Sequence, residues 1–274
     1  MQPNQFFSLE QVIDRQPITV SGETSLNKVI SLMQEWGNSC SFIDGEETLA
    51  TDTDVGSNNS CVLVVEKDKP NGLASQRLRG IFTERDLVKL VATGVNTQSV
   101  TVGEMMTQEV VSLTHTGEQD IFTALSLLKE HRIRHLPVVS DRQSLIGLIT
   151  AKSLRQNLQP LDLMKWRTVA EIMETSIVHA APHDSVQSIA ILMANHNISC
   201  VAIAESEPDP QTNSYWVRPI GIITERDIVQ FQNLDLDLGL PARNLMSAPL
   251  FLVSPQDSLW DINQQMQQYR VRRF

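Results

Sequence analysis

Apolar and polar positions along the chain form four similar blocks. Each block has a short run rich in β-branched and other apolar residues, then a turn rich in Gly, Pro, Asp, Glu and Ser. Apolar residues at the spacing of an amphipathic helix follow the turn. Every block therefore predicts a strand, a turn and a helix. The predicted opening strands are 18–20, 110–113, 177–180 and 250–253, and the predicted helices are 26–36, 121–131, 186–196 and 259–269.

A heptapeptide follows the helix in two blocks and is decayed in a third. Gly-Ile-Phe-Thr-Glu-Arg-Asp at 80–86 returns as Gly-Ile-Ile-Thr-Glu-Arg-Asp at 221–227, and as Gly-Leu-Ile-Thr-Ala-Lys-Ser at 147–153. Its apolar half predicts a buried strand, and its Thr and Asp suit the N-cap and first turn of a following helix. A single copy would indicate a capping box and nothing more. Repetition at domain scale instead indicates an internally duplicated chain.

A second motif, with Thr-Val, a Glu and a Met, stands at 101–107 and 168–174 and more loosely at 241–247. This motif is followed along the chain by the strand, the turn, the helix, an Arg-Ile-Arg-His-Leu-Pro segment and the heptapeptide. The series of motifs, taken in this order, resembles the CBS (cystathionine β-synthase) domain over nearly the whole chain. The resemblance implies an α/β (α+β) fold of β-α-β-β-α copies that pair through their sheets into two Bateman modules. The expected copies are 12–92 (with a polar insert at 41–59), 100–156, 168–231 and an incomplete fourth at 240–274.

Composition narrows the class of protein. The net charge of −10 and the isoelectric point near 5.1 argue against a surface for nucleic acid or anionic membranes. No run of 18 apolar residues predicts a membrane-spanning helix, and the first residues do not resemble a signal peptide. Three cysteines in 274 residues are no disulfide framework. We therefore expect a cytoplasmic protein.

Complementary polar residues are segregated between odd and even copies. The odd copies hold the Thr–Asp pairs of the heptapeptide, and they have Ser60 and Ser199 where the even copies have cations. A hydroxyl and a carboxylate three residues apart at a strand-to-helix turn can hold the two hydroxyls of a ribose. Arg and His suit phosphate oxygens. An apolar slot with backbone polar groups is enough for adenine.

The CBS resemblance assigns roles to these residues. In CBS proteins that bind adenosine nucleotides, the ribose aspartate of one copy faces the basic strand start of the paired copy, which implies one site in each half of the chain. The expected ribose residues are Thr83 and Asp86 at site one and Thr224 and Asp227 at site two. The expected phosphate residues are Arg134, His135 and Lys152 at site one and Arg272 and Arg273 at site two. The weaker candidates for the base are Ile18 and Ile177. A site centred on Ser153 is not expected, because a hydroxyl cannot accept two ribose hydroxyls as a carboxylate can.

Plainer explanations compete with these roles. Arg134 and His135 could pair with surface acids, since such pairs are common and weak. The histidines lack metal-ligand spacing, so no metal site is expected. Cys61 and Cys200 suit small buried apolar positions better than redox centres. The sequence has no P-loop, nucleophile elbow, zinc-protease or dinucleotide motif, so we expect no enzyme and no obligatory cofactor.

The leading hypothesis is a regulatory or sensory module of a bacterial signalling protein. Adenosine nucleotides (AMP, ADP or ATP) would bind between paired copies, with or without Mg²⁺, and would control an output domain or partner. Because the fourth copy stops before its last hairpin, we expect that output on a longer protein or on a separate partner. A homodimer through the CBS copies is also expected. The alternative is an interaction or dimerisation module with degenerate nucleotide sites, and a weaker one is a redox-responsive protein that uses Cys61 or Cys200.

Overall fold

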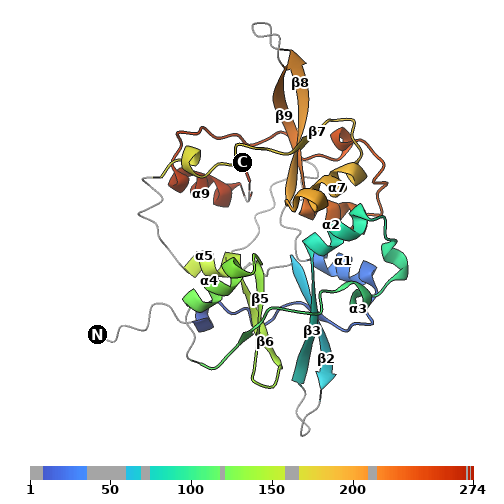
Figure 1. Cartoon of the computed structure of the whole chain (residues 1–274), viewed down its shortest axis with the longest axis vertical. Coiled ribbons are helices and arrows are strands. Elements are labelled where there is room, and N and C mark those ends of the chain that lie inside the picture. The colour runs from blue at the N-terminus through green and yellow to red at the C-terminus, as the bar shows by residue number, and fades with distance from the viewer. Residues whose placement is uncertain are drawn as a thin grey trace, which may run out of the picture. The chain divides into compact units, whose positions relative to one another are not determined.

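The structure is a computed structural model that describes residues 9–35, 60–68, 75–117, 121–157, 167–208, 215–269, 271, 273 and 274. The chain divides into two compact units. The first comprises Met1–Asp86 and Asn96–Gln159, and the second comprises Leu87–Val95 and Pro160–Phe274. Three small sheets, each with helices beside it, give the mixed α/β architecture that the sequence predicts (Figure 1).

The first copy is a three-stranded sheet with one helix in its crossover and one after it. Strand β1 (Thr19–Val20) runs parallel to β2 (Cys61–Asp68), and α1 (Leu26–Glu35) precedes β2 along the chain. Strand β3 (Ser75–Thr83) returns antiparallel to β2 and leads directly into α2 (Glu84–Ala92). This order is the predicted β-α-β-β-α arrangement.

The next two copies repeat this topology. The second has β4 (Leu113–Thr114), α4 (Ile121–Glu130), β5 (His135–Val139), β6 (Leu145–Thr150) and α5 (Ala151–Asn157). The third has β7 (His179–Ala180), α7 (Val186–His196), β8 (Cys200–Pro208), β9 (Tyr215–Thr224) and α8 (Glu225–Asn233). The helix predicted over 186–196 has those bounds, and α4 and α9 end one residue earlier than predicted. The last residue of the helix predicted over 26–36 lies outside the described residues.

Short helical turns precede the opening strands, and the last copy has one long helix. The turns are η1 (Leu9–Gln11), η3 (Thr97–Ser99), α3 (Val102–Met105), η4 (Val169–Glu171) and η5 (Ala242–Asn244). Helix α9 (Leu259–Gln268) fits its prediction closely, but the predicted strand at 250–253 is wrong. Among the described residues this run has no paired strand, and β propensity needs a hydrogen-bonding neighbour to become a strand.

The glycine of each heptapeptide lies where another segment crosses a strand. A Cβ atom at Gly80 would collide with Met106, and one at Gly221 would collide with Met246. At Gly147 the obstacle is backbone, because a Cβ atom there would collide with the carbonyl oxygen of Asp14. Isolated bridges mark the same crossings, between 81 and 107, 222 and 247, and 14 and 148. The glycines therefore admit the segment that leads into the paired copy.

The cores of the first two copies are shared. One buried cluster combines Leu9 and Val12 from the start of the chain with Leu136 and Ile149 from the second copy's hairpin. A second cluster joins residues of β2, β3 and β6. Because neither sheet buries its apolar face alone, the two copies stabilise each other, as expected for a Bateman pair.

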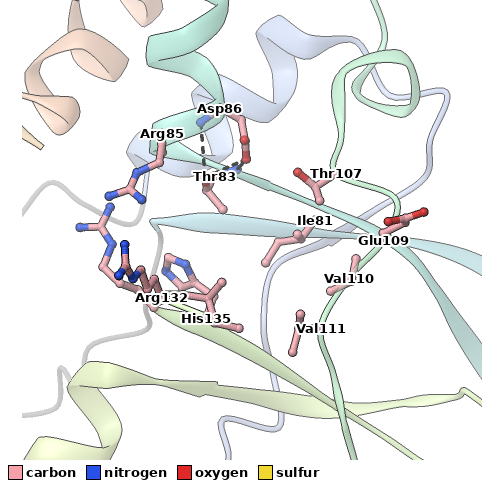
Figure 2. Close-up of a pocket in the computed structure, with 12 residues that line it drawn as sticks. Ile81, Thr83, Arg85, Asp86, Thr107, Glu109, Val110, Val111, Arg132 and His135 are labelled. Carbon is pink, nitrogen blue, oxygen red and sulfur yellow. Dashed lines mark hydrogen bonds between the residues drawn. The ribbon is translucent and has the colours of Figure 1, made fainter. Parts of the chain in front are cut away.

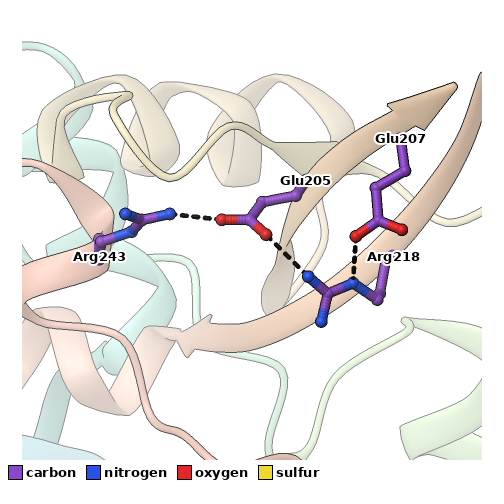
Figure 3. Close-up of polar contacts among 4 residues, drawn as sticks. All are labelled: Glu205, Glu207, Arg218 and Arg243. Atoms are coloured by element: carbon purple, nitrogen blue, oxygen red, sulfur yellow. Dashed lines mark hydrogen bonds and ion pairs between the residues drawn. The ribbon is translucent and has the colours of Figure 1, made fainter.

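An ion-pair network joins β8 and β9 to η5 in the second compact unit (Figure 3). Glu205 accepts hydrogen bonds from Arg243 and from Arg218, the latter at 3.0 Å from Nη2 to Oε2. Arg218 also donates from Nε to Glu207 Oε1 at 2.6 Å. All four side chains are substantially exposed, so the network orders the hairpin at modest energetic gain.

Candidate functional site

The first heptapeptide forms a polar turn between β3 and α2. Asp86 Oδ2 accepts hydrogen bonds from Thr83 N at 2.9 Å and from Thr83 Oγ1 at 2.8 Å. The Asp86 backbone N–H donates back to Thr83 Oγ1 at 3.4 Å. The pair therefore caps the helix, as its sequence indicates. Because both bonds to the carboxylate end on Oδ2, Oδ1 is the oxygen that a ligand hydroxyl would reach.

The second heptapeptide reproduces this turn between β9 and α8. Asp227 Oδ2 accepts from Thr224 N at 2.7 Å and from Thr224 Oγ1 at 2.8 Å. Burial raises the pKa of Asp227 above its ordinary value of 3.8. Hydrogen bonds from Thr224 and the positive charges of Arg273 and Arg226 lower the pKa of Asp227 and oppose the effect of burial. Positive charge therefore lies close to this carboxylate.

The decayed heptapeptide keeps the cap without the carboxylate. Ser153 Oγ accepts from Thr150 N at 3.1 Å, and Ser153 N donates to Thr150 Oγ1 at 3.1 Å. Ser153 Oγ also donates to the Thr150 carbonyl oxygen, at 3.1 Å. A hydroxyl is thus sufficient for capping, whereas the two Thr–Asp turns carry an acceptor beyond what the helix needs.

In each half, a serine of the odd copy contacts a basic residue of the even copy. Ser60 Oγ lies 2.7 Å from His135 Nε2, and Arg273 Nη2 donates to Ser199 Oγ at 2.8 Å. The backbone carbonyl of each serine accepts from the first residue of the helix that follows the Thr, at 3.1 Å in both cases. The serines therefore connect the acidic helix start to the basic strand start, which are the two groups that sequence analysis pairs.

A cavity of about 190 Å³ lies beside the first Thr–Asp turn. Its lining residues are Ile81, Thr83, Arg85, Asp86, Thr107, Glu109, Val110, Val111, Arg132, Ile133, Arg134 and His135.

The basic and apolar residues occupy different ends of this cavity. Figure 2 shows Arg85 and Arg132 at one end, and Val110 and Val111 at the other. Asp86 lies beside Arg85 and Thr83, and Glu109 lies on the side of the valines. The cavity thus offers aliphatic surface, two carboxylates and several cations.

The structure brings together four of the predicted residues of site one, namely Thr83, Asp86, Arg134 and His135. Lys152 and Ile18 are not among the described residues that line this cavity. At site two, Arg273 contacts Ser199 and acts on Asp227, and Arg272 lies outside the described residues.

The predicted base residue of site two departs most from expectation. Ile177 precedes β7 instead of lying in it, and the residue is 64% exposed. The prediction placed it on an opening strand of four residues, but only the last two residues of that run pair with β8.

Sequence reasoning missed several residues of the cavity. Arg85 is inside the heptapeptide and returns as Arg226, so its repetition was a usable signal. Arg132 precedes the recognised basic pair, and its role depends on the backbone at the end of α4. Val110 and Val111 belong to the predicted strand 110–113, yet they lie before β4 and face the cavity instead.

The two described cysteines lie on the strands opposite the two Thr–Asp turns. Cys61 pairs across the sheet with Thr83, and Cys200 pairs with Thr224. Burial raises the pKa of the Cys61 thiol far above its usual range, and the nearby carboxylates of Glu84 and Asp14 raise it further. A thiol held neutral in this way is a poor nucleophile, which argues against redox chemistry at this residue.

The described part of the chain contains neither a cluster of metal-ligating side chains nor a membrane span. No group of three or more His, Cys, Asp or Glu side chains there is placed to hold a metal ion. Equally, none of its helices is long and apolar enough to cross a membrane.

The sequence model of the CBS domain family matches residues 9–93, 102–159 and 169–233, which together exceed half of the chain. The chain therefore belongs to the CBS domain family.

Relatives share the sequence over parts of their length. The chain is 41% identical over 76 residues to the mitochondrial CBS domain-containing protein CBSX3 of Arabidopsis thaliana, covering 27% of this chain and 36% of that protein. It is 20% identical over 278 residues to the uncharacterized protein MJ1404 of Methanocaldococcus jannaschii, covering 96% of this chain and 56% of that protein. The chain thus spans less than two thirds of the length of these curated relatives.

Solved structures share its fold. Protein MJ1225 from Methanocaldococcus jannaschii, a proposed archaeal homologue of g-AMPK, superposes with a TM-score of 0.71 at 17% identity, covering 96% of this chain and 90% of that one. An uncharacterized conserved protein from Pyrococcus horikoshii gives 0.51 at 13% identity, covering 96% and 88%. At these identities the similarity establishes the fold.

Proposed function

We propose that the chain is a regulatory module that binds adenosine nucleotides, one in each half. The observation that carries the proposal is the set of groups that line the cavity of the first compact unit, namely aliphatic side chains, the Thr–Asp turn and cations. A nucleotide has a matching set of groups, with a base, a ribose and phosphates. The CBS family membership and the repetition of the turn in the second half support the same conclusion.

The base would lie against the apolar end of the cavity. Ile81, Val110 and Val111 supply aliphatic surface there. Contacts of this kind fit any flat heterocycle, so the preference for adenine rests on family resemblance and on nearby backbone groups. The cavity is smaller than the roughly 300 to 1,000 Å³ of typical ligand sites. A nucleotide would therefore extend beyond it, towards the exposed arginines.

The ribose would lie at the Thr–Asp turn. Asp86 Oδ1 can accept a hydrogen bond from a ribose hydroxyl while Oδ2 continues to cap the helix. Hydrogen bonds to a charged acceptor contribute about 1.5–3 kcal/mol each. The carboxylate is therefore the residue whose loss should weaken binding most.

The phosphates would lie at the basic end, against Arg134 and His135. The Ser60 contact holds the His135 ring in place across the two copies. In the second half, Arg273 has the corresponding position beside Ser199. The proposal includes Mg²⁺ only as an ion that accompanies the bound nucleotide.

Regulation would follow from the placement of the site between two copies. A ligand that contacts both can favour one packing of the pair over another, and it can do so only through different affinities for the two packings. We propose that this change is passed to an output domain or partner protein, and that the module itself catalyses no reaction. A homodimer through the CBS copies and a cytoplasmic location remain part of this proposal.

A second candidate function is an interaction module without bound nucleotide. Large apolar side chains of the second compact unit favour it, since Ile172, Ile177 and Leu252 are 63%, 64% and 75% exposed. Exposed apolar patches commonly mark protein contacts. A nucleotide-binding module could also have such a surface. Only a measurement of nucleotide binding therefore distinguishes the regulatory module from the interaction module.

Thermal unfolding with AMP, ADP, ATP and S-adenosylmethionine tests the proposal. A ligand at about one hundred times its dissociation constant should add roughly 2.7 kcal/mol per site to the free energy of unfolding. Asp86→Ala and Asp227→Ala should each reduce the shift, and the double variant should abolish it. Ser153→Ala is the matched control, because it alters the decayed turn and should leave the shift intact. An unchanged midpoint with every ligand would reject nucleotide binding and leave the interaction module.

A further inference from the structure

In each half of the chain, a segment crosses the strand that carries the heptapeptide. Thr107 exchanges backbone hydrogen bonds of 2.9 and 3.0 Å with β3, and Ser247 exchanges bonds of 2.9 and 3.1 Å with β9. Val111 stands four residues after the first crossing, and Phe251 stands four residues after the second. Phe251 therefore has the position in the second half that Val111 has in the first, where it lines the cavity of site one.

Ring contacts within the second compact unit place Phe251 close to the groups of site two. Its ring stacks on that of Tyr269, just after α9, with 4.9 Å between the ring centroids and 23° between the ring planes. The ring of Phe274 lies 6.4 Å away, at an angle of 73°. Phe274 directly follows Arg273, whose positive charge acts on the carboxylate of Asp227. The aromatic rings are thus next to the cation and the ribose turn of the second half.

The first half has an aliphatic version of the same arrangement. Val111 packs against the buried cluster that contains Leu136. Leu136 directly follows the cation His135, and Phe274 has the same place after the cation of its own half. Figure 2 shows Val111 facing the cavity of site one. The two halves therefore present different surfaces at one position, aliphatic in the first half and aromatic in the second.

The stacked rings remain accessible. Phe251 is 43% exposed and Tyr269 is 46% exposed, so burial in the core does not explain the aromatic side chains. Aromatic rings bind nucleobases by stacking, because every base has a π face. A ring that is already stacked on a neighbour is held in one orientation, which lowers the entropy cost of binding.

We infer that site two holds a purine base by stacking on Phe251, and that this residue sets the preference of site two for purines. The inference rests on the proposed function, because it names the residue that recognises the base at the second site. It assigns to Phe251 the role that the sequence predicts for Ile177. Site one, with Val111 at the same position, holds its base by aliphatic contacts and should distinguish bases less.

Phe251→Leu is the sharpest test, because leucine keeps an apolar side chain and removes the ring. The full chain with Asp86→Ala confines binding to site two, and isothermal titration gives dissociation constants for AMP and UMP. In this parent, AMP should bind at least about fivefold more tightly than UMP, since the larger purine ring has more surface to stack. Phe251→Leu should weaken AMP binding roughly tenfold and UMP binding less than about threefold.

Two further variants separate the ring from the segment that carries it. Phe251→Tyr keeps a ring and should therefore retain the affinity for AMP. Leu252→Ala changes the neighbouring side chain, which is 75% exposed, and should leave both dissociation constants unchanged. Unfolding midpoints measured without ligand should stay close to that of the parent, because Phe251 and Leu252 lie outside the buried core.

Four results would overturn the inference while leaving nucleotide binding in place. These are an unchanged AMP affinity in Phe251→Leu, an equal loss for AMP and UMP in that variant, an equal loss of AMP affinity in Phe251→Tyr, and an equal loss in Leu252→Ala. Absence of binding in the Asp86→Ala parent, with binding retained by the unmodified chain, would overturn the inference and leave site one. Absence of binding by the unmodified chain would overturn the proposed function, and the inference with it.

Discussion

The two Thr–Asp turns are built alike, but the residues that face them differ. Thr83–Asp86 and Thr224–Asp227 have hydrogen bonds that match within 0.2 Å. The facing cation is a histidine beside Ser60 in the first half and an arginine beside Ser199 in the second. The turn and the serine are thus repeated features of the scaffold, whereas the cation varies between the halves.

This difference between the halves distinguishes the residues that maintain the structure of a site from the residues that determine its ligand. The serine bond and the capped turn depend on backbone geometry, which both halves reproduce. The cation sets the charge available to a ligand, because arginine is always charged and histidine is charged only at lower pH. Changes to the scaffold should therefore affect both halves in the same way, and changes to the cations should distinguish them.

The largest effect is expected where backbone crosses a heptapeptide glycine. Gly147→Ala would place a methyl group against the Asp14 carbonyl, which cannot move without shifting the N-terminal segment that bridges to β6. We expect the free energy of unfolding to fall by about 1–3 kcal/mol, measured by chemical denaturation.

The matched control for this change is in the other half. Gly221→Ala meets mainly the flexible Met246 side chain, which can turn away, so a smaller loss is expected. Equal losses of stability for Gly147→Ala and Gly221→Ala would contradict this reasoning, because they would show that the flexibility of the Met246 side chain does not reduce the cost.

A smaller effect is expected from the two serines. Ser60→Ala and Ser199→Ala each remove the hydrogen bond that holds a facing cation. A neutral hydrogen bond contributes about 0.5–1.5 kcal/mol, so AMP should bind roughly 3- to 10-fold more weakly at site one in Ser60→Ala. The bond from the charged Arg273 contributes about 1.5–3 kcal/mol, so the loss at site two in Ser199→Ala should be larger. Calorimetric titration should show no change for adenosine, which lacks the phosphate. An equal loss for adenosine would mean that the serines support the fold and not the cation.

Acidification should affect site two through Asp227. Its pKa is raised in the folded state, so on lowering the pH the folded protein takes up this proton before the unfolded chain does. This group therefore adds stability as the pH falls from the raised pKa towards 3.8, and the contribution is lost again as the pH rises. Nucleotide binding should move in the opposite direction, because protonation removes the charged acceptor for ribose.

Both trends can be measured with Asp86→Ala, in which only site two binds, by following the unfolding midpoint and the affinity across acidic pH. The added change Asp227→Asn should remove this group's contribution to the pH dependence of the unfolding midpoint. A pH dependence of the midpoint that is unchanged by this second change would have to come from another group.

The smallest effect is expected from the exposed ion pairs. Arg243→Ala removes one partner of Glu205 in the second half, and Arg79→Ala removes the partner of Glu66 in the first. Exposed pairs contribute about 0.2–1 kcal/mol, so both variants should lose little stability and less still at high salt. A loss in Arg243→Ala well above that in Arg79→Ala would show that the network in Figure 3 acts cooperatively.

Much of the fold could be predicted from the sequence because its signals are local. Helical periodicity located α7 to the residue, and the heptapeptide located the ends of β3 and β9. Long-range pairing could not be predicted in the same way. The run at 250–253 has strand composition, yet a strand forms only beside another strand, and composition does not reveal the neighbour.

The candidate site was predictable where one residue type implies one chemistry. The Thr–Asp turns and the cations at 134 and 135 are of this kind, and their approach follows from the pairing of copies. Arg132 was missed because its direction depends on a left-handed cap, which a sequence indicates only when Gly or Asn is present. Val110 and Val111 were missed because the strand that follows them begins later than its composition suggests.

The register of β2 with β3 and of β8 with β9 gives each half its own reporter. Cys61 lies opposite Thr83 and is buried, so its thiol should react with an alkylating reagent only as its strand separates from the first Thr–Asp turn. Cys200 lies opposite Thr224 and is partly buried, so its labelling should be slowed by occupancy of the second turn. In a chain with Cys40→Ser, the labelling rate of Cys61 measures the opening free energy of its turn, and that of Cys200 reports on the second turn separately. Occupancy of one site then appears as slower labelling of one cysteine, resolved by peptide mass. The cysteine on the strand beside each turn can thereby report how long a ligand stays bound at that turn.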